Sequence, residues 1–156
     1  MEQKICMFTG HRDIRAEHVT LLTEWLDKTV EGLIAEGYTD FCAGGAIGFD
    51  TLAALKVIEK KEKYGFIKLH LFLPCRDQDA RWNENYRRAY RYVMSKADSI
   101  RYASESYNRG CMHKRNREMV KAADVCIAYC VTNEGGTYYT VNQAKEKGMR
   151  VIFFEG

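Results

Sequence analysis

Three short segments of this sequence combine glycine with hydroxyl or charged side chains. They are Thr9-Gly10-His11-Arg12, Gly44-Gly45-Ala46-Ile47-Gly48-Phe49-Asp50 and Gly135-Gly136-Thr137. Glycine lets a backbone approach a ligand closely, and the backbone N–H groups that open a following helix attract anions. The three segments therefore predict a site for a phosphate or a similar anion, which a side chain at Gly48 would fill.

Each segment also has an ordinary structural interpretation. Thr9, Gly10 and Arg12 would form a plain turn, or Arg12 would bind a phosphate through its planar fork. Asp50 would stabilise the start of a helix or hydrogen-bond a ribose hydroxyl, and Thr137 would cap its helix or donate to a phosphate. The spacing after Gly44 matches neither G-x-G-x-x-G nor the P-loop, which needs Lys followed by Ser or Thr.

A basic cluster opens the helix expected over 111–122. Its members are His113, Lys114, Arg115 and Arg117. Cations in a first turn oppose the helix dipole, but helical side chains lean toward the N-terminus and would meet an anion there. The wider segment 81–121 holds eleven Lys or Arg against four Asp or Glu, which suits an anionic ligand or, alternatively, a solvated helix face.

Strand-like and helical stretches alternate and would position these segments. The expected strands cover 5–8, 38–43, 67–73, 99–102, 124–130 and 151–154. The expected helices cover 19–34, the stretch from the second glycine segment to about residue 63, 80–97, 111–122 and 137–147. Continuous apolar strands between helices predict an α/β fold, a doubly wound, mostly parallel, Rossmann-like sheet, formed as a single domain over 1–156. Ligands of such sheets bind beyond the carboxyl ends of the strands.

Composition excludes several classes of protein. The 156 residues lack an apolar run of the roughly 20 residues that cross a bilayer, so we expect no membrane contact. The six cysteines have no C-x-x-C spacing, which favours reduced thiols, a cytoplasmic location and no metal site. Cys111 stands out because it lies in a candidate binding loop. No nucleophile–base pair is evident, so catalysis stays unassigned and no cofactor is expected.

Longer runs resemble a known family. T-G-H-R, G-G-A-I-G-F-D-T-L-A-A, L-P-C-R-D-Q-D-A-R-W, R-N-R-E-M-V-K-A-A-D-V-C-I-A-Y and the closing G-G-T are similar to the YpsA-like family of uncharacterised bacterial proteins. The spacing of Pro74, Gln78 and Trp82 is the most specific part, and the resemblance covers nearly the whole chain. It implies a Rossmann-like domain of the SLOG superfamily, grouped with the Lonely Guy phosphoribohydrolases and the DNA-processing Smf proteins, and a nucleotide-derived ligand.

The Lonely Guy enzymes carry M-H-x-R-K on a helix and P-G-G-x-G-T-x-x-E in a loop. Residues 112–115 match the first run, with Asn116 in place of its Lys, while Gly135, Gly136 and Thr137 match the second without its Glu. The resemblance thus implies that Arg115 contacts a phosphate, whereas the catalytic acid does not carry over.

Three functions remain open from the sequence. The first is binding or sensing of a nucleotide-like small molecule: an ADP-ribose-like, NAD-derived or nucleoside monophosphate ligand. The second is a phosphoribohydrolase that cleaves the N-glycosidic bond of a nucleoside monophosphate. The third is single-stranded nucleic-acid binding through the aromatic and arginine residues of 86–92, ranked last because helical spacing turns several aromatics inward. Homo-oligomerisation also stays open.

Overall fold

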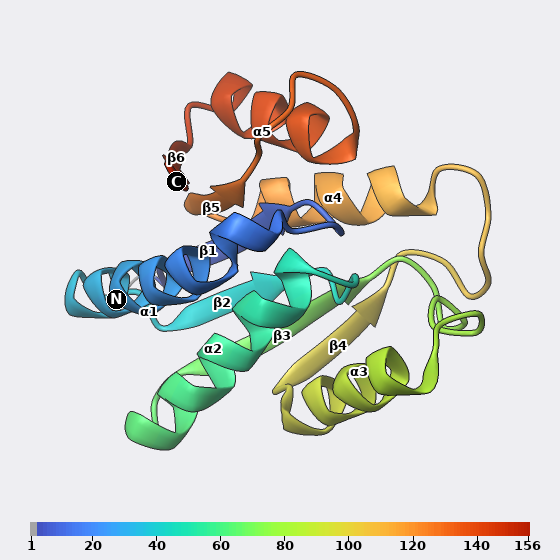
Figure 1. The fold of residues 1–156 in the computed structure, drawn as a ribbon, viewed down its shortest axis with the longest axis horizontal. Helices are drawn as coiled ribbons and strands as arrows, with labels where there is room; N and C mark the ends of the chain where they lie inside the picture. Colours follow the sequence, from blue (N-terminus) through green and yellow to red (C-terminus); the bar gives the residue numbers. More distant parts are fainter. Residues whose placement is uncertain (1–2) are drawn as a thin grey trace.

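Six strands form one sheet in the computed structural model, which describes residues 3–156 (Figure 1). Their order is β4-β3-β2-β1-β5-β6, and every pair among the described residues is parallel. The strands are β1 (Ile5–Gly10), β2 (Asp40–Ala43), β3 (Lys68–Leu73), β4 (Ser99–Tyr102), β5 (Val125–Tyr129) and β6 (Arg150–Phe153). The predicted α/β, Rossmann-like fold is confirmed.

Helices cover both faces of this sheet, as a doubly wound fold requires. They are α1 (Val19–Ala35), α2 (Phe49–Lys63), α3 (Glu84–Lys96), α4 (Cys111–Ala122) and α5 (Gly136–Glu146). One apolar cluster joins the sheet to Leu26 of α1, Ala53 of α2 and Val93 of α3. A second cluster on the other face includes Met119 of α4 and Val141 of α5. The sheet therefore lies between α1–α3 and α4–α5.

Two helices begin earlier than the sequence suggested. Helix α2 starts at Phe49, so Asp50 belongs to its first turn and not to the preceding loop. Helix α5 starts at Gly136, its N-cap is Gly135, and no side chain makes a capping hydrogen bond. The expected capping role of Thr137 is therefore wrong.

The cysteines pack largely as expected. Cys6, Cys42 and Cys126 are buried in strands, and burial raises the pKa of the Cys42 and Cys126 thiols to about 12. Cys111 is also buried, at 1% exposure, because it opens α4 against the protein interior. It does not sit in an open binding loop. No helix within residues 3–156 combines the length and the apolar character needed to cross a membrane.

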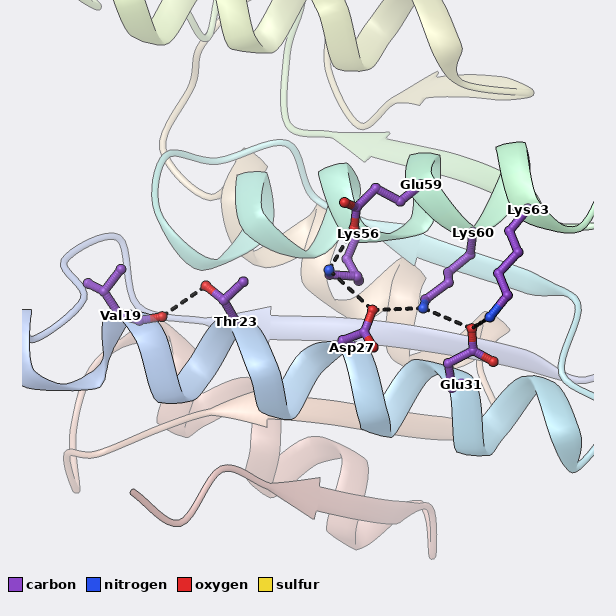
Figure 2. A network of polar contacts seen from close by, with 8 residues as sticks. All are labelled: Val19, Thr23, Asp27, Glu31, Lys56, Glu59, Lys60 and Lys63. Atoms are coloured by element: carbon purple, nitrogen blue, oxygen red, sulfur yellow. Dashed lines mark hydrogen bonds and ion pairs between the residues drawn. The ribbon is translucent and has the colours of Figure 1, made fainter.

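A charged network joins α1 to α2 (Figure 2). The Lys60 ammonium donates to Asp27 Oδ1 at 2.7 Å and to Glu31 Oε1 at 2.9 Å, although Lys60 is only 5% exposed. Glu31 also accepts from Lys63 at 2.8 Å and from the Tyr64 hydroxyl at 2.8 Å. These hydrogen bonds, led by the one from Lys63, lower the pKa of Glu31 to about 2. The network fixes α2, whose N-terminal end faces the candidate site.

Candidate functional site

A cavity of about 770 Å³ lies at the carboxyl edge of the sheet, where the winding of the chain reverses between β1 and β5. Its walls come from the end of β1, from the loops after β1, β2, β3 and β4, from α4 and from the start of α5. The lining residues are Phe8, Thr9, Gly10, His11, Arg12, Ala46, Asp50, Asp77, Gln78, Ala80, Arg81, Trp82, Tyr107, Met112, Arg115, Asn116, Met119, Gly136 and Thr137. Open α/β sheets bind ligands at this switch point, so we call it the switch-point cavity.

The predicted site residues divide into two groups here. Eight of them line the switch-point cavity: Thr9, Gly10, Arg12, Asp50, Arg115, Asn116, Gly136 and Thr137. The other four, Gly44, Gly45, Gly48 and Gly135, are not part of its lining. The structure thus brings the three predicted segments together, but it gives most glycines of the second segment a different task.

Gly48 serves close packing of the protein against itself. Its φ is +88°, and a Cβ atom there would overlap the backbone carbonyl of Arg12. A Cβ on Gly44 would likewise overlap the Arg115 guanidinium. The expectation that a side chain at Gly48 would fill the cavity is therefore wrong, because that side chain would push α2 away from the loop after β1.

Arg115 is held by its own protein. It is 5% exposed, and its Nη1 donates to the carbonyl oxygens of Gly44 and, at 3.4 Å, of Phe72. Its Nε donates to Asn116 Oδ1 at 2.7 Å. Burial lowers the pKa of Arg115 and raises the pKa of the neighbouring, fully buried Asp50. The guanidinium thus joins the carboxyl ends of β2 and β3 to α4, and few of its donors remain for a ligand.

Two other arginines reach the cavity from exposed positions. Arg12 follows β1 and Arg81 precedes α3, and neither makes an ion pair within the described part of the chain. Arg81 was not among the expected site residues, because a lone arginine in a polar loop gives no sequence signal. Both therefore add positive charge without an ion-pair partner to the lining of a largely apolar cavity.

The loop after β3 supplies a further wall that the sequence only partly indicated. Gln78 Nε2 donates to the Tyr90 hydroxyl at 3.1 Å and to the Gly45 carbonyl at 3.4 Å, and the Trp82 ring packs edge-on against Tyr90 at 5.1 Å. The buried Gln78 Oε1 has no partner among the described residues. Pro74, Gln78 and Trp82 carried the most specific family signal, which could have marked this wall as part of the site.

His11 connects the two loops that meet at the switch point. Its Nε2 accepts a hydrogen bond from the Val131 backbone N–H at 2.9 Å, which requires an unprotonated Nε2. Burial, with a contribution from Arg15, lowers the pKa of His11. The neutral form that the hydrogen bond needs is therefore the favoured one.

One polar cluster lies outside the cavity and escaped the sequence analysis. His70 Nδ1 is 2.6 Å from Ser99 Oγ, and His70 Nε2 is 2.7 Å from Asp40 Oδ2. Parallel register places the three residues on β2, β3 and β4, so no local spacing could reveal them. None of them lines the switch-point cavity, and the cluster ties three strands together.

Curated relatives match this chain over most of its length. A UPF0398 protein of Bacillus pumilus is 28% identical over 77% of this chain and 66% of its own length. One from Bacillus cereus (strain B4264) is 26% identical over 93% of this chain and 84% of its own.

Two solved structures share the fold. One is DNA processing protein A (DprA) from Streptococcus pneumoniae, with a TM-score of 0.73, 19% identity, and coverage of 99% of this chain but 50% of that one. The other is DNA processing protein A from Helicobacter pylori, described by its single-stranded DNA binding mode, with a TM-score of 0.70, 16% identity, and coverage of 98% and 66%.

A family model also matches most of this chain. The model of the YpsA family, described as the YspA SLOG family, matches residues 6–152. The expected family is thereby confirmed, and the structural likeness to DNA processing protein A agrees with the expected grouping with Smf proteins. This chain belongs to the YpsA family of SLOG proteins.

Proposed function

We propose that this chain binds a nucleotide or a nucleotide-derived ligand in the switch-point cavity. The observation that carries the proposal is the pairing, in one cavity of about 770 Å³, of aromatic walls with two unpaired arginines and a helix N-terminus. Small-molecule sites typically have volumes of about 300–1,000 Å³ and apolar walls with a few convergent polar groups. An ADP-ribose-like, NAD-derived or nucleoside monophosphate ligand combines a flat apolar base with phosphate.

The lining offers groups for both parts of such a ligand. Trp82, Tyr107 and Met112 offer flat or flexible apolar surface for a base. Arg12 and Arg81 offer free cations for phosphate, and the backbone N–H groups at Gly136 and Thr137 open α5 toward the same cavity. In this assignment Arg115 and Asp50 are buried parts of the lining, and Arg115 mainly holds the surrounding loops because Gly44, Phe72 and Asn116 already accept its hydrogen bonds.

Calorimetry with AMP, ADP-ribose and NAD⁺ tests this proposal. We expect Arg12→Gln to weaken binding of the best ligand by about tenfold or more, since it removes a charged hydrogen bond. Arg88→Gln is the matched control, because it removes the same charge from the exposed surface of α3. Equal losses in both variants, or no binding by the wild type, would refute the site. Mass spectrometry of ligands released from denatured protein would identify the natural ligand.

A second candidate is single-stranded nucleic-acid binding. The fold likeness to the Helicobacter pylori protein favours it. Helix α3 also exposes Tyr86 at 48% and Tyr92 at 43%, and it buries only Tyr90 of the three tyrosines, so the expectation that several turn inward is wrong. Exposed aromatics near arginines stack bases. However, Arg88 and Arg91 both approach Glu84, at 3.6 and 3.9 Å, which reduces their attraction for phosphates.

Fluorescence anisotropy with a short labelled single strand separates the two candidates. Electrostatic binding weakens steeply with salt, so we expect no dissociation constant tighter than about 1 μM at physiological salt. Nanomolar binding that persists there, and that is lost in Tyr86→Ala, would rank nucleic acid above a free nucleotide.

A further inference from the structure

Helix α4 separates the switch-point cavity from a second cavity of about 690 Å³. Met112, Arg115 and Asn116 face the first, and they follow helical spacing. His113, Lys114 and Arg117 line the second, together with Arg109 and Gly110 from the preceding loop and Tyr139 from α5. We call this second cavity the basic groove.

The charged side chains that line the basic groove are all positive. Arg109, Lys114 and Arg117 contribute positive charge, and no Asp or Glu is among the lining residues. On α3, by contrast, Arg88 and Arg91 pair with the carboxylate of Glu84. No ion pair involves Arg109, Lys114 or Arg117 within residues 3–156. The positive charge of the groove is therefore left uncompensated by the protein.

The charges at the start of α4 are opposite to those that usually stabilise a helix N-terminus. The first turn of α4 contains no acidic residue, and its N-cap, Gly110, provides no side-chain hydrogen bond. Cations at this end of a helix, such as Lys114, are unfavourable by roughly 0.3–1 kcal/mol each, and the like charges of Lys114 and Arg117, neighbours on the helix surface, add repulsion. When a sequence places unfavourable charges at a helix start and no carboxylate pairs with them, the surface that carries these charges is a candidate functional surface.

The side chains are partly fixed in place around the groove. Lys114 Nζ donates to the Ala103 carbonyl at 2.8 Å, which holds the lysine across the loop after β4. The His113 ring lies edge-on to Tyr139, with their centroids 5.3 Å apart. Asn108 Nδ2 donates to Ser104 Oγ at 2.6 Å and braces the loop that forms the opposite wall. These contacts hold Lys114, His113 and the loop of Asn108 in defined positions around the groove.

We propose that the basic groove is a second anion site, separate from the switch-point cavity, that binds phosphate groups. A ligand with two or more linked phosphates would meet Arg109 and Arg117 as charge-assisted hydrogen-bond donors, and its charge would offset the crowding at the start of α4. The phosphates come either from a free polyphosphate or from the backbone of a strand. This site does not depend on whether the switch-point cavity holds a nucleotide.

Calorimetric titration with inorganic tripolyphosphate at low salt tests the groove directly. The double variant Arg109→Gln/Arg117→Gln should lose about tenfold or more in affinity, the expected effect of removing charged hydrogen bonds. Arg88→Gln/Arg91→Gln removes the same net charge from α3 and should stay within about twofold. Circular dichroism melting checks that both variants are folded. The same double substitution in an Arg12→Gln background should lose affinity by the same factor, because Arg12 lines the other cavity.

A parallel titration with a short thymidine oligonucleotide identifies the source of the phosphates. Groove-dependent binding of tripolyphosphate alone indicates a free polyphosphate, and groove-dependent binding of the oligonucleotide alone indicates a strand. The proposal is overturned if the wild type binds neither probe, if the two double variants lose equal affinity, or if only Arg12→Gln weakens binding. That last result would place the anion in the switch-point cavity and would leave the proposed function intact.

Discussion

Some residues of the candidate site face the cavity, whereas others pack against the rest of the protein. The sequence singled out the glycines and Arg115, but residue types alone could not show which way these residues face. Gly48 faces the Arg12 backbone, and Arg115 faces the carbonyls of Gly44 and Phe72. A glycine beside a ligand and a glycine beside another strand look the same in one sequence, because both simply lack a Cβ atom.

Substitution of Gly48 by alanine separates the packing role from a ligand role. We expect Gly48→Ala to lower the free energy of unfolding by at least about 2 kcal/mol, since the left-handed backbone disfavours a side chain and its Cβ would overlap Arg12. Gly32→Ala in α1 is the control, because its Cβ would meet no atom within 4 Å, and it should stabilise by about 0.5–1 kcal/mol. Urea denaturation measures both. Equal stabilities of the two variants would contradict the packing role.

Arg115 should matter more for stability than for ligand affinity. Arg115→Ala leaves buried carbonyl oxygens and the buried Asp50 without their cation, so we expect a loss of about 3 kcal/mol in unfolding free energy. Arg115→Lys should recover only part of it, since lysine lacks the planar fork. Arg12→Ala, at an exposed position, should change stability by less than about 0.5 kcal/mol. A fully stable Arg115→Ala protein that fails to bind nucleotide would restore the phosphate role.

At the scale of elements, the sequence anticipated most of the fold. Strand 99–102 and helix 111–122 coincide with β4 and α4, because apolar periodicity and flanking glycine or charged residues mark them locally. The errors fall mainly at helix starts. Helices α2 and α5, whose starts lie beside glycine, begin earlier than expected, and α3 begins at Glu84 where the expected helix began at residue 80. Glycine gives no side-chain cap, so the start of such a helix depends on tertiary contacts such as the Phe49 N–H bond to the His11 carbonyl.

The link between the loops after β1 and β5 should respond to pH through His11. Its folded-state pKa lies below its ordinary value near 6.5, so the unfolded chain binds more protons just below that pH. Stability is therefore complete above about pH 6.5 and falls as the pH drops toward the folded-state pKa. Urea midpoints at about pH 7.5 and 5.5 should differ for the wild type.

Two variants isolate the contribution of His11 to that pH dependence. His11→Gln keeps an acceptor for the Val131 N–H but does not titrate, so its midpoint should fall less on acidification. His113→Gln, at an exposed position on α4, should keep the wild-type slope. An unchanged slope in His11→Gln would show that another group carries the pH dependence.

Across the whole molecule, the candidate site follows from the winding of the chain. Residues near positions 10, 50, 80, 115 and 136 meet because every βα loop opens at the same edge and the winding reverses beside β1. The sequence predicted the glycine loops at this edge, because ligands of parallel sheets bind beyond the carboxyl ends of the strands. It could not place Arg81 or Tyr107, because long loops after β3 and β4 carry them there without any periodic pattern.

The carboxylates at the cavity decide whether a nucleotide bound there could also be cleaved. Breaking an N-glycosidic bond develops positive charge on the ribose, which a positioned carboxylate must stabilise. Glu134 is exposed and does not line the cavity. Asp77 lines it, and its Oδ1 accepts the Tyr107 backbone N–H at 3.1 Å. Asp50 also lines it but is buried, accepts the Ala46 N–H at 3.2 Å, and has its pKa raised by burial. A carboxyl group that is harder to ionise is a poorer stabiliser of developing positive charge. We therefore expect bound AMP to release no free base, measured by chromatography over hours. Turnover that is retained in Glu134→Gln and lost in Asp50→Asn would instead make Asp50 the catalytic carboxylate and the protein a phosphoribohydrolase.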